Sequence, residues 1–125
     1  MTVQRLHHVQ LSVPSVLIDA QRLFYGELIG LTVHQETVPG HRLRIGTEGG
    51  RIDLVAADTS SPLGQDAHIA LEVDDFRSVR QRLTGAGFAI DEERPLPGYL
   101  RLYVVDPAGH RIEILQALPG SELSP

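Results

Sequence analysis

The chain has 125 residues, enough for one domain with a hydrophobic core, and its 42% hydrophobic and 22% charged residues are typical of a soluble globular protein. No apolar run approaches the roughly 20 residues of a membrane span. The absence of cysteine excludes disulfides, thiolate metal ligands and a cysteine nucleophile, and all eleven basic residues are arginine, which excludes Schiff-base chemistry through lysine. The net charge of -5, without a basic stripe, argues against a nucleic-acid partner. No signal-peptide core follows Met1, so we expect a cytoplasmic protein.

The first half of the chain predicts a strand, a helix and three further strands, in that order. Alternation with a period of two indicates the strands, helical spacing indicates the helix, and proline and glycine mark their ends. In the helix, we expect Ala20, Leu23, Phe24 and Leu28 on one side. The expected elements are strand Leu6–Val13, ended by Pro14; helix Val16–Ile29, ended by Gly30; and strands Thr32–Thr37, His41–Gly46 and Arg51–Ala56, with turns at Pro39-Gly40 and Gly49-Gly50.

The same order of elements starts again after a linker-like stretch. The expected elements are strand Ala67–Val73; helix Phe76–Ala86, with an N-cap at Asp74-Asp75 and a stop at Gly87; a weaker strand at Phe88–Glu92; strand Tyr99–Val105; a turn at Asp106–Gly109; and strand Arg111–Gln116. We therefore predict a single domain, with module one at residues 1–56, a linker at 57–66, module two at 67–116 and a short polar tail at 117–125.

The sequence also matches itself at an offset of about 60 residues. His8 falls on His68, and Asp53 falls on Glu113, so the histidine and the carboxylate are 45 positions apart in both halves. The aliphatic strand positions and the Gly-x-Arg-Ile segments of the two halves also match. Chance similarity between two α/β halves is the alternative, but agreement at both ends of the repeat argues against it.

Strand alternation places these four residues on equivalent faces. Each strand has an aliphatic face, which we expect to pack on the helices, and a polar face centred on His8, Asp53, His68 or Glu113. Two imidazoles and two carboxylates suit one divalent ion such as zinc, nickel, iron(II) or manganese, and the carboxylates balance its charge. The sequence therefore predicts one metal site where the two halves meet.

Each of these residues, taken singly, is more often structural than a ligand. Arg51 and Arg111 are candidate ion-pair partners for the neighbouring carboxylates. We exclude His7 as a ligand, because alternation puts it on the helix-facing side of its strand. We expect the remaining histidines, for which the repeat gives no support, at the surface: His34, His41 and His110.

Four segments spread over almost the whole chain carry a resemblance: Leu6–Leu11, Phe24–Leu31, His68–Asp75 and Asp106–Glu113. They resemble the vicinal oxygen chelate superfamily, which includes glyoxalase I, methylmalonyl-CoA epimerase, ring-cleaving dioxygenases, fosfomycin-inactivating thiol transferases and bleomycin-binding resistance proteins. The resemblance implies an α+β fold in which two βαβββ modules form an open barrel around a metal. It also implies that the metal ligands are His8, His68 and Glu113.

Two positions depart from the pattern of glyoxalase I. Asp53 stands where that enzyme has a fourth ligand, normally glutamate, and its side chain is one methylene shorter. Direct ligation by Asp53 and a role beside the metal as general base therefore both stay open. Ser12 stands near the position of an arginine that holds glutathione, so the resemblance gives less support to glutathione as a cosubstrate.

Four further residues are candidates for contact with a small-molecule substrate. Alternation puts Arg101 and Tyr103 on the polar face of their strand, where a guanidinium can anchor a carboxylate or phosphate and a phenol can donate to an oxyanion. Pairing of Arg101 with a nearby carboxylate is an equal alternative. Gln10 shares the polar face with His8, and Tyr99 follows a Pro-Gly turn, where closing the pocket and packing in the core are equal alternatives.

Three functions remain open. In the first, a metal-dependent enzyme of lyase or isomerase type chelates two neighbouring oxygens of the substrate and stabilises an enediolate, while a carboxylate, Asp53 or Glu113, moves a proton. The second is an iron(II) ring-cleaving dioxygenase with two histidines and one carboxylate, and the third is a metal-free, drug-binding resistance protein. We favour the first, because a second carboxylate is present. We also expect a homodimer, because each module is an open sheet with exposed edges, and the modules can pair within a chain or between chains.

Overall fold

Residues 2–34, 40–58, 64 and 66–120 are described by a computed structural model. The chain divides into two compact units, Met1–Pro62 and Leu63–Pro125, called the first and second modules below. The division falls within the expected linker, most of which lies outside the described residues, as do Pro39 and the last five residues of the tail. Within the described parts of the chain, none of the helices has the length and apolar character needed to cross a membrane.

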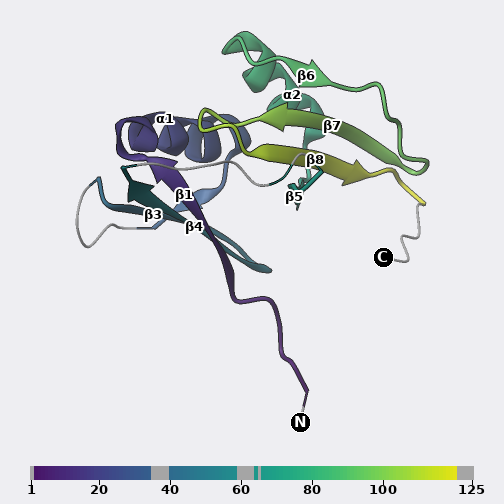
Figure 1. The fold of residues 1–125 in the computed structure, drawn as a ribbon. Helices are drawn as coiled ribbons and strands as arrows, with labels where there is room; N and C mark the ends of the chain where they lie inside the picture. The colour runs from purple at the N-terminus through teal and green to yellow at the C-terminus, as the bar shows by residue number, and fades with distance from the viewer. Residues whose placement is uncertain (1, 35–39, 59–63, 65, 121–125) are drawn as a thin grey trace. The chain divides into compact units, whose positions relative to one another are not determined.

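The first module is a mixed four-stranded sheet with one helical segment (Figure 1). The strand order is β1-β4-β3-β2; β1 is parallel to β4, and the other pairs are antiparallel. The elements are β1 (His8–Pro14), η1 (Ser15–Leu17), α1 (Ile18–Arg22), η2 (Leu23–Ile29), β2 (Thr32–Val33), β3 (Arg42–Thr47) and β4 (Gly50–Ala57).

The helical segment of the first module changes geometry along its length, where the sequence predicted one regular helix. A 3₁₀ turn, η1, leads into the short α-helix α1 and then into a π-helical turn, η2. It ends at Gly30, as predicted, in the left-handed conformation with φ of 95°. The expected inward side was wrong at Leu23, which is 53% exposed, because 3₁₀ and π turns rotate successive side chains by different angles from an α-helix. The buried side consists of Ile18, Gln21, Phe24, Tyr25 and Ile29.

The second module repeats this topology, which confirms the predicted α+β fold of two βαβββ modules. The strand order is β5-β8-β7-β6, again with one parallel pair, β5 with β8. The elements are β5 (Ile69–Glu72), α2 (Phe76–Gly85), β6 (Ile90–Asp91), β7 (Tyr99–Val105) and β8 (Arg111–Ala117).

Helix α2 begins with a predicted cap and one contact that the sequence did not suggest. The side chain of Asp75 accepts a hydrogen bond from the backbone N–H of Ser78 at 3.2 Å. The Phe76 N–H donates to Gln116 Oε1 at 2.8 Å, and Gln116 Nε2 donates to the Asp74 carbonyl at 2.8 Å, so a side chain of β8 holds the start of the helix. The sequence predicts four side chains on the inward side of this helix. Three of them, Phe76, Val79 and Leu83, are buried, but the prediction was wrong for Ala86, which is exposed because α2 already ends at Gly85.

The strand faces follow the predicted alternation, and the structure also decides the faces of β3. Leu43 and Ile45 are fully buried, so Arg42 and Arg44 lie on the polar face. Arg44 lies opposite Asp53, whereas a fixed 60-residue offset puts both arginines against the helix. The reason is that the paired residues Arg44 and Asp53 are 9 positions apart along their hairpin, whereas Tyr103 and Glu113 are 10 positions apart along theirs.

Candidate active-site faces

The polar face of the second module brings together two of the predicted metal ligands. His68 lies directly before β5, and Glu113 lies in the middle of β8, where it is paired with Ala70 on one side and Tyr103 on the other. The Nε2 atom of His68 is 2.9 Å from Glu113 Oε1, and the carboxylate is only 8% exposed. The other ring nitrogen, Nδ1, is 3.1 Å from the carbonyl oxygen of Asp66, which orients the ring. An imidazole nitrogen and a carboxylate oxygen are therefore held side by side.

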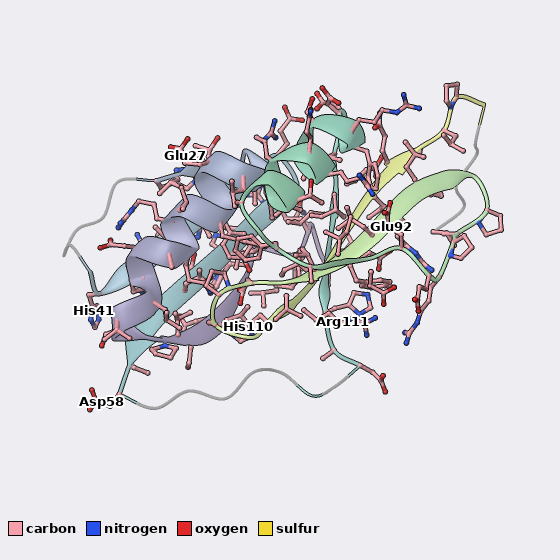
Figure 2. All side chains as sticks on the ribbon, turned by 90° about the horizontal axis from the view of Figure 1, so that it is seen from above. Glu27, His41, Asp58, Glu92, His110 and Arg111 are labelled. Carbon is pink, nitrogen blue, oxygen red and sulfur yellow. The ribbon has the colours of Figure 1, made fainter. Side chains whose placement is uncertain are left out.

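The substrate-contact candidates of β7 lie on the same face. The Nη1 atom of Arg101 is 3.6 Å from Glu113 Oε2, and its Nε donates to the Arg94 carbonyl at 3.0 Å. The Tyr103 ring lies edge-on to His68, with ring centroids 5.4 Å apart. Arg111 places its Cζ atom 4.1 Å from the centroid of the Tyr103 ring (Figure 2), so this arginine stacks on an aromatic ring. Arg101 thus pairs with the Glu113 carboxylate, which was one of the two expectations for this arginine.

The polar face of the first module holds its carboxylate differently. Arg51 and Asp53 lie two positions apart on β4, and Asp53 is 1% exposed. Arg51 forms a bidentate ion pair with Asp53, with Nε to Oδ1 at 2.6 Å and Nη2 to Oδ2 at 3.1 Å. Both carboxylate oxygens are thus engaged by the guanidinium, which was one of the alternatives that the sequence left open.

This ion pair sets the charge state of Asp53. Burial by itself raises the pKa of a carboxyl group, but the hydrogen bonds and charge of Arg51, with smaller contributions from His8 and Arg44, outweigh it. The net effect is that the pKa of Asp53 is lowered. Asp53 is therefore ionised at neutral pH and is a weaker proton acceptor than an ordinary aspartate.

His8 and Gln10 project from the polar face of β1 beside this pair. The backbone register places His8 opposite Arg51 and Gln10 opposite Asp53, and both side chains are exposed. The Nδ1 atom of His8 is 2.8 Å from Nδ1 of His7, which lies just before β1 and is also exposed. One ring nitrogen of the exposed His8 is thus in contact with the neighbouring imidazole.

Tyr99 and His110 occupy buried positions in the second module. Tyr99 begins β7 and is 8% exposed, so it packs in the module; burial, together with the negative charge of Glu72, raises the pKa of its phenol. His110, labelled in Figure 2, was expected at the surface, and this was wrong. It is only 3% exposed, and its backbone N–H donates to the Asp106 carboxylate at 2.9 Å in the turn before β8. His34 and His41 are exposed, as predicted.

The predicted metal ligands are divided between the modules, with His8 in the first and His68 and Glu113 in the second. Within the described residues, no group of three or more histidine, aspartate or glutamate side chains forms a cluster suited to a metal. The His68–Glu113 pair fits part of a divalent-metal site, because a buried carboxylate beside an imidazole offers one oxygen and one nitrogen donor. Asp53 fits less well as a ligand, because Arg51 engages both of its oxygens.

Each module also contains a surface pocket. In the first module, a pocket of about 490 Å³ is lined mainly by Ser15, His41 and Asp58, and none of the predicted site residues lines it. In the second, a pocket of about 410 Å³ is lined by Tyr103 and Arg111, together with Arg94, which the sequence analysis did not single out. Arg94 lies in an irregular connection after β6, where no strand alternation could have assigned it to a face.

Comparison with known proteins gives a family match over most of the chain. The family model described as Glyoxalase/Bleomycin resistance protein/Dioxygenase superfamily matches residues 5–114. No curated protein matches the sequence significantly.

Solved structures similar to this chain have different functions. A glyoxalase family protein from Bacillus anthracis is 26% identical, with a TM-score of 0.80 and coverage of 94% of this chain and 98% of that chain. An oxidase, ChaP-H2, is 28% identical, with a TM-score of 0.74 and coverage of 97% and 98%. An antibiotic binding protein from Streptomyces sp. CB03234 is 21% identical, with a TM-score of 0.71 and coverage of 94% and 99%, a likeness that shows the fold alone.

Proposed function

Because the chain belongs to the glyoxalase/bleomycin resistance protein/dioxygenase superfamily, we propose that it is a metal-dependent enzyme acting on a small molecule with two neighbouring oxygen atoms. The proposed ligands of one divalent ion (zinc, nickel, iron(II) or manganese) are His8, His68 and Glu113. The observation that carries this proposal is the 2.9 Å contact between His68 Nε2 and Glu113 Oε1 on a polar sheet face. His8 occupies the matching position in the first module.

The proposed reaction is a proton transfer of lyase or isomerase type. When bound, the metal would supply Lewis-acid stabilisation of negative charge on the neighbouring oxygens. The part of the protein is to accept a proton and return it, and Asp53 and Glu113 are the carboxylates proposed for this step. Arg51 keeps Asp53 ionised and ready to accept, but its lowered pKa means that only an acidified C–H group can give up its proton.

One observation favours a second candidate, an iron(II) dioxygenase or oxidase. The bidentate Arg51–Asp53 pair engages the second of the two candidate carboxylates and reduces the proposed ligand set to two histidines and one carboxylate. Such a set suits iron(II) and leaves coordination positions open for substrate and O₂. The 28% identity to an oxidase supports the same candidate.

The metal content of the purified protein tests the common part of both candidates. We expect about one divalent ion per chain by elemental analysis of protein purified without added metal, and a loss of affinity in His68→Ala that exceeds the roughly 10–100-fold cost of removing a supporting partner. The matched control is His34→Ala, which removes an exposed histidine directly after β2. This variant should bind metal as the wild type does. Full metal occupancy in a folded protein lacking His8, His68 and Glu113 would refute the ligand set.

Asp53→Asn then separates the two reactions. For proton transfer, we expect most metal affinity to remain while turnover falls on the order of 100-fold or more, as for a lost general base. Exchange of a substrate C–H with deuterated solvent measures this step directly, and O₂ uptake measures the alternative. Full activity of Asp53→Asn, or stoichiometric O₂ consumption, would favour the dioxygenase.

We also propose that the protein acts as a cytoplasmic homodimer of single-domain chains. The edge strands of the two sheets, β2 and β6, have only two residues each among the described residues, and a second chain can extend such an edge. Sedimentation equilibrium at micromolar concentration should give twice the mass of the 13.7 kDa chain. A single species at the monomer mass would contradict the dimer.

A further inference from the structure

The pocket of the second module combines apolar walls with two guanidinium groups. Ile90 of β6 and the exposed Val105 of β7 supply apolar surface, and Tyr103 lies beside them. Arg94 and Arg111 are the cations that line this pocket of about 410 Å³, and Asp91 is the acidic residue that lines it. Two positive charges face one negative charge, so the pocket is net positive in a chain whose net charge is -5.

Arg111 is positioned to bind an anion. Its guanidinium lies over the Tyr103 ring, which fixes the plane of the group while leaving its edge able to donate hydrogen bonds. Among the described residues, no carboxylate is within ion-pair distance of Arg111 or of Arg94. Glu113, the carboxylate on the same sheet face, contacts His68 and Arg101 instead. Two guanidiniums without acidic partners beside a pocket favour an anionic ligand.

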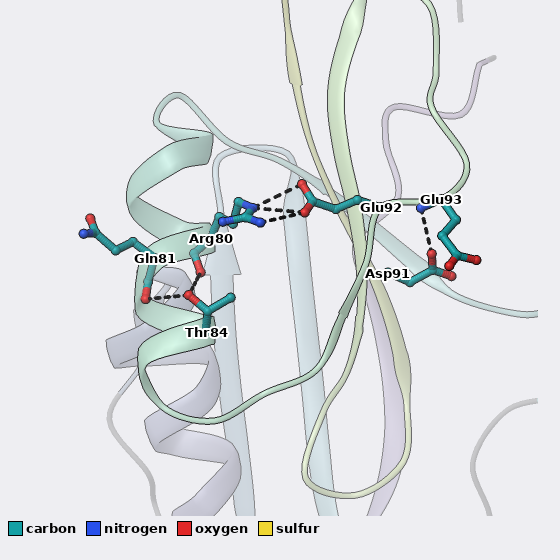
Figure 3. Close-up of polar contacts among 6 residues, drawn as sticks. All are labelled: Arg80, Gln81, Thr84, Asp91, Glu92 and Glu93. Carbon is teal, nitrogen blue, oxygen red and sulfur yellow. Dashed lines mark hydrogen bonds and ion pairs between the residues drawn. The ribbon is translucent and has the colours of Figure 1, made fainter.

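The segment that carries Arg94 is held in place on two sides. Arg80 of α2 forms a bidentate ion pair with Glu92, with Nη2 to Oε1 at 2.8 Å and Nε to Oε2 at 3.1 Å (Figure 3). The Glu93 N–H donates to Asp91 Oδ1 at 2.9 Å, which commits one oxygen of that carboxylate (Figure 3). On the other side, Arg101 donates from both Nε and Nη2 to the Arg94 carbonyl. The backbone that presents Arg94 is therefore tethered next to the pocket.

We propose that this pocket binds the anionic end of an amphiphilic acid, a carboxylate or a phosphate monoester, between Arg94 and Arg111, with the apolar body of the molecule against Ile90 and Val105. Arg101, which the sequence suggested as the anion anchor, instead positions the Arg94 segment. If the proposed enzyme function holds, the anion is its substrate class, and only this identification rests on the proposed function. Binding of the anion itself needs one module and no metal.

Calorimetric titration of the full-length protein tests the proposal with benzoate, phenyl phosphate and benzamide. We expect both anions to bind and benzamide, the neutral counterpart of benzoate, to bind at least about 10-fold more weakly, because it forms no charge-assisted hydrogen bond. Arg111→Met and Arg94→Met should each weaken benzoate binding to a similar extent. The matched control is Arg77→Met, which removes the same charge from an exposed position of α2. A stronger response to phenyl phosphate than to benzoate identifies the phosphate source, and the reverse identifies the carboxylate.

Two further measurements separate this site from the proposed metal site. Titrations before and after dialysis against a chelator should agree, whereas an anion bound to the metal would be lost, which would overturn the arginine site. In ¹⁵N spectra, the Nε–H signals of Arg94 and Arg111 should shift on addition of benzoate, a readout that holds even where a variant folds poorly. Unmoved arginine signals, equal binding of benzamide, or an equal loss in Arg77→Met would each refute the proposal, whatever the metal content.

Discussion

The two modules share one topology but treat their central carboxylates differently. In the first module, Arg51 clamps Asp53 through two hydrogen bonds. In the second, the matching arginine, Arg111, lies over the Tyr103 ring, and Glu113 contacts His68 and, at a longer distance, Arg101. A repeated backbone therefore does not guarantee a repeated site, because the partner of each carboxylate depends on the side chains around it.

The residue opposite each carboxylate explains the difference. Arg44 of β3 lies opposite Asp53, and Tyr103 of β7 lies opposite Glu113. The face of the Tyr103 ring binds the Arg111 guanidinium, whereas among the described residues no aromatic ring lies over Arg51. The longer side chain of Glu113 also reaches the histidine at the edge of the sheet. The residue opposite each carboxylate on the neighbouring strand thus determines whether that carboxylate is available to bind a metal.

Substitution of Tyr103 should break this difference with the largest effect. In Tyr103→Arg, the ring that holds Arg111 is lost and a second guanidinium faces Glu113, so the second module comes to resemble the first. We expect metal affinity, measured by calorimetric titration, to fall about 10–100-fold, as for loss of a group that orients a ligand. Tyr103→Phe keeps the ring and should bind metal as the wild type does; an equal loss in both variants would show that the phenol, and not the ring, matters.

The pH dependence of stability should separate the modules more modestly. The folded-state pKa of Asp53 is lowered, so its ion pair contributes stability above the unfolded pKa of about 4, and this contribution is lost as pH falls through the folded pKa. The stability difference between wild type and Asp53→Asn should therefore shrink below about pH 4 in urea unfolding experiments. Asp19→Asn, which removes a 93% exposed partner of Arg22, should show little difference at any pH. A difference for Asp53 that grows in acid would contradict the assignment.

The smallest expected effect concerns the helix starts. The second module caps α2 with Asp75 and ties it to Gln116, whereas η1 starts without a side-chain cap. Asp75→Ala should cost about 1 kcal/mol in the free energy of unfolding, and Gln116→Ala a similar amount. Ser15→Ala, at the start of η1, should cost a few tenths of that. Equal losses at both helix starts would remove this difference between the modules.

The order of elements along the chain, the helix end at Gly30 and the cap at Asp75 follow from local patterns, and the sequence predicted them. The internal repeat also located the His68–Glu113 pair, because alternation fixes which side chains share a face. The features that the sequence did not predict depend on contacts between residues far apart in the sequence or on irregular connections. Gln116 caps a helix 40 positions earlier, and Arg94 lies in a connection without regular alternation.

The burial of His110 has a related cause. The backbone N–H groups of Ala108 and His110 both donate to the Asp106 side chain, so the turn that carries His110 is fixed by hydrogen bonds within it. Composition gives no sign of it, because polar turn residues are usually solvated. Leu23 shows the opposite error: its α-helical spacing is correct, but the helix changes to a π turn at that residue.

The shorter connection between β3 and β4 also changes how the two halves should be aligned. With a one-residue gap in that hairpin, Arg42 and Leu43 become the counterparts of Arg101 and Leu102, and the alternation of β3 and β7 agrees throughout. The β3–β4 hairpin then corresponds to the β7–β8 hairpin strand by strand. Such a correspondence is what a duplicated gene segment leaves behind when one copy loses or gains a single codon in a surface loop.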